Sequence, residues 1–426
     1  MSLRLPLSGA LAAAALTLVA LFLFSEPALA ADGAGFGGFL RANMAPVMFA
    51  ALVVFLLLGY PVAFALAANG LFFAIIGIEL GLFQPNFLQA LPERIYGTMN
   101  NDTLLAIPFF TFMGLILERS GMAEDLLETI GQLFGTIRGG LAYAVIFVGA
   151  MLAATTGVVA ASVISMGLIS LPIMLRYGYD RRLASGTIAA SGTLAQVIPP
   201  SLVLIVLADQ LGRSVDQLYK GALLPGVMLA GLYALYVFIV CRFNPAAGPG
   251  LPPEEIAHRK PDGSRGLISL GVLAALSGGI ATGVLWNSGY GTMGFFILVL
   301  AVSILIALAT ALVNKLIIRQ TGRGFLSPLA ERVTFVMVPP LMLIFLVLGT
   351  ILIGLATPTE GGAMGAVGAL LLAGINRYSN REPQRLNWNI VRQATEATAK
   401  LSTFVMFILI GARIFSLTFY GVNGHI

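Results

Sequence analysis

Charged side chains are scarce in this chain. Of its 426 residues, 10% are Asp, Glu, Lys or Arg, whereas 58% are hydrophobic. A soluble globular domain carries about 25% charged residues, so a water-soluble fold is excluded. The long apolar runs leave room for roughly ten spanning helices of about 20 residues each. Because these runs are continuous and do not alternate with period two, they predict an all-α, polytopic membrane protein rather than a barrel.

Cysteine and histidine are nearly absent as well. The single cysteine, Cys241, lies inside an apolar run, which excludes a disulfide framework. His258 lies in a loop and His425 lies at the terminus, so we expect no transition-metal site and no cofactor. The chain also lacks a glycine-rich loop followed by lysine, so ATP does not drive it directly. No nucleophile–base pair appears on the spans, which argues against an enzyme.

The few charges are mostly basic and give a net charge of +5. Binding to nucleic acid is one explanation, but basic loops held in the cytoplasm explain the balance better. The strongest basic clusters are the turn Arg176–Arg182 and the loop Lys315–Arg332. We therefore predict that both clusters lie in the cytoplasm, with the lipid bilayer as the surroundings and no nucleic-acid partner.

The first 31 residues allow two interpretations. Arg4 precedes an apolar stretch, and Ala28-Leu29-Ala30 is typical of a signal-peptide cleavage site. The segment is also long enough to be a first transmembrane helix. Glu26 and Pro27 make a poor helix end, which favours a cleaved or anchoring signal-type segment.

A stretch rich in small and hydroxyl-bearing residues, 149–201, is the first candidate site. Two apolar arms, 139–175, meet at a small tip, and a following segment ends in two prolines. Glycine and proline interrupt a helix and leave backbone carbonyls without their helical hydrogen-bond partners. Transporters build ion sites from such interrupted helices. Hard monovalent cations such as sodium take neutral oxygen ligands of this kind. Packing of small residues between helices is the alternative. The candidate ligands are Thr155, Thr156, Gly157, Gly192, Thr193, Pro199 and Ser201.

The second candidate site interrupts another long apolar run at Thr357, Pro358, Thr359 and Glu360. A carboxylate buried between apolar runs is a functional hypothesis by default. Glu360 is predicted to bind a cation, to carry a proton, or to cap the following helix. Arg413, inside the last span, is predicted to meet a carboxylate or an anionic substrate, or to reach the interface.

The two halves of the chain echo one another. Gly59-Tyr60-Pro61 breaks a long apolar run in the first half, as residues 357–360 do in the second. Paired interrupted segments indicate a transporter built from repeats, with its site at the repeat interface. The predicted division is a signal-like or first transmembrane segment at 1–31, a first repeat at 32–243, a loop at 244–265, scaffold helices at 266–332 and a second repeat at 333–426.

These motifs together resemble the large membrane subunit of TRAP transporters, the tripartite ATP-independent periplasmic type. The resemblance rests on the Gly-Tyr-Pro break, the hairpin, the Ile-Pro-Pro-Ser block at 198–201 and the Thr-Pro-Thr-Glu block at 357–360. The Ala154-Thr155-Thr156-Gly157 tip is similar to the branch labelled mannitol or chloroaromatic-compound transporters. The resemblance covers most of residues 44–421.

The resemblance implies an inverted-repeat, elevator-type symporter in the bacterial inner membrane, with re-entrant hairpins and a sodium gradient as its energy source. A periplasmic binding protein would deliver an organic acid, and a small membrane subunit would complete the transporter. Thr155–Gly157 and Gly192–Ser201 would frame one sodium site, and Thr357–Thr359 would belong to the substrate cavity and second site. A proton-coupled transporter using Glu360 is the alternative, and an intramembrane enzyme or scaffold is a further one. The family's second hairpin is expected after Gly421, so the second repeat is expected to be truncated.

Overall fold

The computed structural model describes residues 36–156, 159–252, 267–286, 291–321, 324–380 and 386–424. These residues form helices and connecting turns, and none of them belongs to a strand. The prediction of an all-helical fold is therefore confirmed. The predicted segment 1–31 lies outside the described residues, as does most of the loop 244–265.

Seven helices among the described residues are long and apolar enough to cross a membrane. An eighth candidate is the pair of consecutive segments Phe87–Met99 and Asp102–Arg119, which are long and apolar enough only when taken together. The sequence offered room for roughly ten spans. The difference arises because three apolar helices, among them Leu202–Leu211, are too short to cross alone. The chain is a multi-pass membrane protein.

The described helices divide into two compact units. Unit 1 comprises the described part of residues 1–101 together with 400–426. It contains α2 (Phe36–Leu57), α3 (Val62–Glu79), η2 (Phe87–Ala90), α4 (Leu91–Met99) and the second part of α17 (Trp388–Gly421). The Gly-Tyr-Pro break separates α2 from α3. Gly59 there adopts a φ of 83°, a left-handed conformation that glycine tolerates best. The break thus produces two spans rather than one kinked helix.

Helices α3 and α17 of unit 1 approach each other backbone to backbone. A Cβ at Gly411 would lie 2.5 Å from the Ala63 carbonyl oxygen, and one at Gly70 would lie 2.8 Å from the Ile414 carbonyl oxygen. The Thr418 hydroxyl donates a hydrogen bond to the Gly70 carbonyl at 2.9 Å. Small residues that allow such close contact are the usual means of helix association in membranes.

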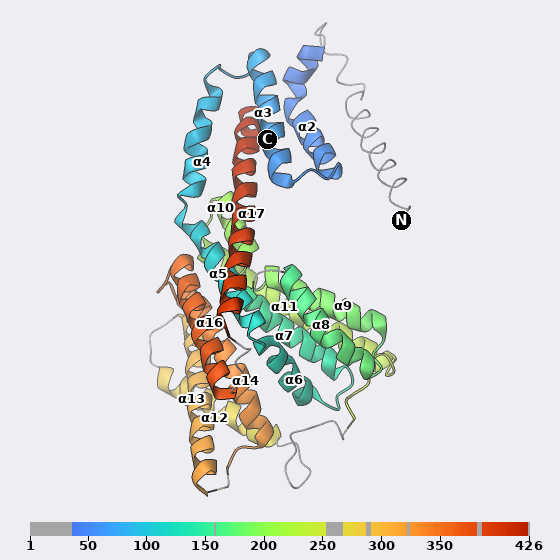
Figure 1. The fold of residues 1–426 in the computed structure, drawn as a ribbon, viewed down its shortest axis with the longest axis vertical. Coiled ribbons are helices and arrows are strands. Elements are labelled where there is room, and N and C mark those ends of the chain that lie inside the picture. The colour runs from blue at the N-terminus through green and yellow to red at the C-terminus, as the bar shows by residue number, and fades with distance from the viewer. Residues whose placement is uncertain are drawn as a thin grey trace. The chain divides into compact units, whose positions relative to one another are not determined.

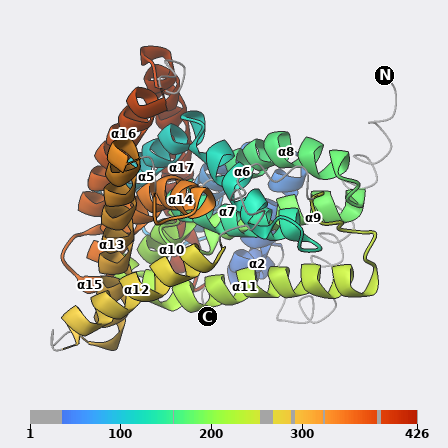
Figure 2. The ribbon, with the colours of Figure 1, turned by 90° about the horizontal axis from the view of Figure 1, so that it is seen from below.

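Unit 2 covers residues 102–399. Its elements are η3 (Asp102–Leu105), α5 (Ala106–Arg119), α6 (Met122–Phe134), α7 (Gly140–Thr156), α8 (Val159–Arg176), α9 (Arg181–Thr193), η4 (Leu194–Gln196), α10 (Leu202–Leu211), α11 (Val215–Phe243), α12 (Leu267–Leu285), α13 (Thr292–Thr321), α14 (Pro328–Ile344), the π-helical turn η6 (Phe345–Gly349), α15 (Thr350–Ile353), α16 (Pro358–Asn380) and the start of α17. Helices α6–α9 gather on one side of the unit and α12–α16 on the other (Figures 1 and 2).

Helices α7 and α8 form a hairpin whose two open ends lie together. At these ends, the Gly139 N–H donates to the Gly248 carbonyl at 2.8 Å and the Asp180 N–H donates to the Ala247 carbonyl at 2.9 Å. The Tyr179 hydroxyl, which is buried, accepts a hydrogen bond from the Leu141 N–H at 3.1 Å. Burial raises the pKa of Tyr179 to about 12, so it remains a neutral phenol. The arms predicted at 139–175 are therefore joined at their base.

Helix α16 packs in the middle of its side of unit 2. Its glycine face allows α5 and α14–α15 to approach closely, because a Cβ at Gly362 would lie 3.0 Å from Phe109 and one at Gly361 would lie 2.7 Å from Ile351. The same face carries Gly365 and Gly368. Close approach through glycine is a membrane packing device that hydrophobicity alone does not supply.

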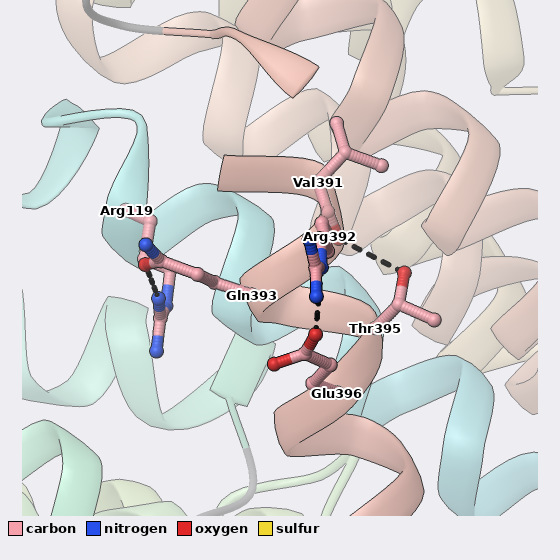
Figure 3. Close-up of polar contacts among 6 residues, drawn as sticks. All are labelled: Arg119, Val391, Arg392, Gln393, Thr395 and Glu396. Atoms are coloured by element: carbon pink, nitrogen blue, oxygen red, sulfur yellow. Dashed lines mark hydrogen bonds and ion pairs between the residues drawn. The ribbon is translucent and has the colours of Figure 1, made fainter. Parts of the chain in front are cut away.

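The start of α17 carries a polar face that contacts α5 (Figure 3). The Arg119 guanidinium donates a hydrogen bond to the Gln393 side-chain oxygen. Along α17 itself, Arg392 pairs with Glu396 at 2.8 Å, and the Thr395 hydroxyl donates to the Val391 carbonyl at 2.9 Å. The first turns of the last long helix are thus hydrophilic.

Candidate functional site

The double proline interrupts the backbone between α9 and α10. In a continuous helix, the N–H groups of residues 199 and 200 would donate to the carbonyls of Ala195 and Gln196. Proline has no N–H, so both donors are missing and the helix stops. The Ser201 hydroxyl replaces one of them by donating to the Gln196 carbonyl at 2.8 Å. Pro199, Pro200 and Ser201 are all buried, so this irregular backbone lies inside the protein.

The hairpin and α11 surround this break. Leu194, Ala195 and Ile198 form a buried cluster with Ala150 of α7 and Val159, the first residue of α8 after the tip. On the other side, a Cβ at Gly226 of α11 would lie 2.9 Å from the Ile198 side chain. Residues of both hairpin arms, Ala150 and Val159, therefore pack against the residues that lead into the Ile-Pro-Pro-Ser break.

Two glycines allow α9 to pack closely against both arms of the hairpin. A Cβ at Gly149 of α7 would lie 2.7 Å from Cβ of Ser191, and a Cβ at Gly192 would overlap Val163 of α8. Gly192 was predicted as a site residue, and in the structure it also has a packing role. The absence of a side chain at Gly192 brings the end of α9 against the arm that leads to the tip.

Two buried hydroxyls, one on α9 and one on α11, have no hydrogen-bond partner among the residues that the structure describes. Ser191 and Tyr219 are 0% exposed, and neither side-chain oxygen has a partner of good geometry. The Tyr219 hydroxyl lies close to the Ser201 backbone. Buried polar groups are normally satisfied, so each unsatisfied one calls for an explanation such as a bound ion or water. Sequence reasoning missed Tyr219, and no motif could have indicated it, because only the fold carries α11 past Ser201.

The remaining predicted ligands of the first site have mixed outcomes. Thr155 and Thr156 are the last two residues of α7, next to the tip, and Gly157 lies outside the described residues. The exposed Thr193 directs its hydroxyl to the Ala190 carbonyl at 2.7 Å, within its own helix. No observation tests whether these residues bind an ion, so that assignment stays a prediction.

The second candidate site is the start of α16, where the four residues form a capping box. The Glu360 carboxylate accepts hydrogen bonds from the Thr357 N–H at 2.8 Å and the Thr357 hydroxyl at 2.9 Å. The Glu360 N–H donates in return to the Thr357 hydroxyl at 3.2 Å. Pro358 occupies the first helical position, where its missing N–H has no consequence. Of the three roles predicted for Glu360, the structure contains the capping role.

The prediction that Glu360 is buried is wrong, because its side chain is exposed. The apolar runs on both sides suggested burial, but the left-handed turn at Gly354, with a φ of 83°, carries the chain outward before α16 begins. The Thr359 hydroxyl donates to the Asp102 carbonyl at 2.7 Å, which ties this turn to η3. Arg413 belongs to unit 1, where it lies half-buried on α17.

The first site offers neutral oxygens and no carboxylate from the residues named above. Among the described residues, no group of three or more His, Cys, Asp or Glu side chains could hold a metal ion. Divalent cations in proteins favour carboxylate ligands, whereas the serine and tyrosine hydroxyls and backbone carbonyls at the break suit a monovalent cation.

Comparison with known proteins places the chain among transporters. Residues 49–426 match the DctM component of the tripartite ATP-independent periplasmic transporter. The large permease protein DctM of the C4-dicarboxylate TRAP transporter from Pseudomonas aeruginosa is 32% identical over 202 residues, which cover 47% of each chain. The DctM protein from Vibrio cholerae is 29% identical over 238 residues, 55% of this chain and 51% of the relative. The large permease protein UehC of the ectoine/5-hydroxyectoine TRAP transporter from Ruegeria pomeroyi is 28% identical over 241 residues, 57% and 55% of the two chains.

The chain thus matches about half the length of these curated relatives. The relatives are named as transporter permease proteins rather than enzymes, and the apolar spans fit a multi-pass protein of the inner membrane. Because the family match covers most of the sequence, this chain belongs to the DctM component family of the tripartite ATP-independent periplasmic transporters.

Proposed function

We propose that this chain is the large permease subunit of a sodium-driven symporter that imports an organic acid. In this proposal a periplasmic substrate-binding protein delivers the acid, and a small membrane subunit completes the assembly. Membership of the family supports both partners. The names of the relatives include C4-dicarboxylate, ectoine and 2,3-diketo-L-gulonate, which are all organic acids, and this supports the substrate class.

The observation that carries sodium coupling is the break between α9 and α10. The Tyr219 hydroxyl, which has no hydrogen-bond partner of good geometry among the described residues, lies by the Ser201 backbone at this break. The similarly unsatisfied Ser191 hydroxyl lies on α9, the helix that leads into the break. A sodium ion would satisfy these oxygens without a countercharge, as in other transporters with discontinuous helices. Thr155 and Thr156 end the neighbouring arm and are proposed to add ligands.

We further propose that the hairpin is a re-entrant segment that moves with the transport site in an elevator-type mechanism. The lengths of its helices support this. Helices α7 and α8 have 17 and 18 residues. At 1.5 Å per residue these helices are about 26 Å long, shorter than the roughly 30 Å hydrocarbon core. We therefore propose that the hairpin enters the membrane and returns on the side where its base is joined, rather than crossing the membrane twice. The relation of the two repeats as inverted copies is part of the same proposal.

The first test compares unfolding of the purified protein in sodium and potassium chloride at equal ionic strength. We expect sodium to raise the apparent Tm, because an ion that binds only the folded state stabilises it in proportion to the logarithm of its concentration. Thr156→Val should reduce the sodium effect while leaving the Tm in potassium unchanged. Thr310→Val is the matched control, because the Thr310 hydroxyl bonds only along α13, to Ile306.

Tyr219→Phe should likewise weaken the sodium effect, since it removes one unsatisfied oxygen and leaves the ring in place. Equal protection by the two ions in the unaltered protein, together with uptake that follows the proton gradient alone, would contradict sodium coupling. If sodium still raises the Tm of both Thr156→Val and Tyr219→Phe by the full amount, the ion binds elsewhere in the protein.

A further inference from the structure

A polar hollow lies in unit 2 where α10, α11, η3 and α16 meet. Its volume is about 320 Å³, and it is open to the surface. The polar residues that line it are Thr103, Asp209, Arg213, Ser214 and Asp216, with Pro358 at its edge. We call this hollow the vestibule. It is distinct from the break at residues 197–201, which lies at the other end of α10.

Helix α10 begins at the break at residues 197–201 and ends at the vestibule. Helix α9 begins in the basic turn Arg176–Arg182, and the broken α9–α10 segment runs from there to the vestibule. Helix α14 begins at the second basic cluster, and the chain reaches Pro358 only after α14 and α15. Both routes lead from a predicted cytoplasmic end to the vestibule. With the basic clusters in the cytoplasm as predicted, our inference places the vestibule on the periplasmic side, from which a binding protein would deliver its cargo.

One cation and one anion dominate the lining of the vestibule. The Arg213 side chain is exposed and has no ion pair or hydrogen-bond partner among the residues that the structure describes. Asp216 is paired with Lys220 at 3.4 Å, so its charge is offset. Asp209 also lines the vestibule, and one of its carboxylate oxygens accepts a hydrogen bond from Gln210 at 2.9 Å.

The turn between α10 and α11 holds Arg213 in this position. Gly212 ends α10 with a φ of 62°, a left-handed conformation, and the Arg213 N–H donates to the Ala208 carbonyl at 2.9 Å. The turn therefore fixes the backbone from which the guanidinium extends into the solvent-filled hollow. A guanidinium with unused donors binds a carboxylate through two parallel hydrogen bonds.

We infer that the vestibule is a receiving site for a small zwitterionic acid, with its carboxylate on Arg213 and its cationic group toward Asp209. This inference rests on the proposed transport function and narrows its substrate class. A dicarboxylate fits less well, because its second carboxylate would face Asp209 with no second unpaired arginine or lysine lining the vestibule among the described residues. The second carboxylate and the Asp209 carboxylate would repel each other, which would offset part of the attraction between Arg213 and the first carboxylate.

The test uses a cysteine placed in the vestibule. The chain has one cysteine, Cys241, which is buried, so Ser214→Cys supplies one accessible thiol. The full-length protein in lipid nanodiscs is treated with a charged maleimide, and the labelling rate is measured with ectoine or succinate present. We expect ectoine, a zwitterion, to slow the labelling more strongly than succinate, a dianion. Gln217→Cys, on the same helix but outside the lining, should be labelled at the same rate in both.

Adding Arg213→Gln to Ser214→Cys should weaken protection by ectoine about tenfold or more, because the charge-assisted hydrogen bonds to the carboxylate are lost. Arg242→Gln, which removes the same charge from the other end of α11, should leave protection unchanged. Asp209→Asn should reduce the preference for ectoine over succinate. Retained protection in Arg213→Gln, or stronger protection by succinate than by ectoine in Ser214→Cys, would overturn the assignment.

The labelling assay needs no sodium gradient, so its result is independent of sodium coupling. If sodium drives uptake but no acid protects the thiol, the vestibule assignment fails while the proposed function stands. If ectoine protects the thiol but no gradient drives uptake of any acid, the proposed transport function fails and the binding site stands.

Discussion

Glu360 illustrates how one residue can satisfy a motif without performing the chemistry that the motif suggested. Its carboxylate and the Thr357 hydroxyl exchange hydrogen bonds at the start of α16. A capping pair of this kind satisfies backbone N–H groups that the first turn leaves without partners. The pair is exposed, so its contribution is local to the helix terminus.

Removing the cap should destabilise the protein modestly. Thr357→Ala is expected to lower the free energy of unfolding by about 1 kcal/mol, the usual loss for an N-cap residue. Thermal unfolding in detergent would measure this, with Thr395→Ala as a control whose hydroxyl bonds only to the Val391 carbonyl within α17. A Thr357→Ala protein no less stable than the control would contradict the capping role.

The same residue separates the two coupling mechanisms. Glu360→Gln keeps an oxygen that can accept the capping hydrogen bonds but removes the ionisable group. If the carboxylate only caps α16, uptake by this variant should keep the sodium and pH dependence of the unaltered protein. Loss of pH-dependent uptake in Glu360→Gln, with stability retained, would instead support proton coupling.

Residue-level prediction from the sequence succeeded where the cause is local. The breaks at Gly59–Pro61, Pro199–Pro200 and Thr357–Glu360 all appear, because glycine and proline limit the backbone wherever they stand. The burial of Glu360 was predicted wrongly, and Tyr219 and Arg213 were not predicted at all. Their surroundings are set by residues distant in sequence, which neither composition nor spacing reveals.

At the scale of elements, the sequence identified apolar spans better than polar helices. Helix α6 (Met122–Phe134), whose apolar face packs against the hairpin, is not among the elements that the sequence predicted. Neither are the short helices η2 and α4, which lie between residues 87 and 99. Helices of this kind are stabilised by tertiary contacts more than by their own propensity, so polarity alone concealed them.

Helix packing in unit 1 should be sensitive to a single methyl group. Gly411→Ala would place a Cβ against the Ala63 carbonyl oxygen, a backbone atom that cannot turn away. We expect a loss of about 1–3 kcal/mol in the free energy of unfolding, as for other overpacked interiors. Gly97→Ala on α4, where no atom lies within 4 Å, should instead stabilise by about 0.5–1 kcal/mol. Similar effects of the two variants would argue against the close approach of α3 and α17.

At the scale of the whole molecule, the hydrogen bonds of unit 2 bring the two basic clusters to one end. The turn around Asp180 bonds to Ala247, and Gly248 bonds to the start of the hairpin at Gly139. Arg332, at the end of the second cluster, pairs with Glu128 of α6 at 2.9 Å. This agrees with the predicted cytoplasmic placement of both clusters. The division into repeats at 32–243 and 333–426 stays a prediction.

Labelling from one side of the membrane tests this orientation. Ser185→Cys lies near the basic turn, and Gln217→Cys lies near the opposite end of unit 2, both on exposed positions. We expect an impermeant thiol reagent added to spheroplasts to modify Gln217→Cys at once and Ser185→Cys only after permeabilisation. The reverse pattern would invert the topology and would place the vestibule in the cytoplasm.

The shortness of α10 also bears on how the protein is made. With ten residues it is about 15 Å long, half of what a lone helix needs to cross the hydrocarbon core. The insertion machinery therefore cannot release α10 into lipid as an independent span, because the carbonyls at its broken start would meet hydrocarbon. It must remain beside the machinery until α11 has been synthesised and covers the break with Tyr219 and Gly226. The length of α10 thus makes its insertion depend on the helix that follows it in the chain.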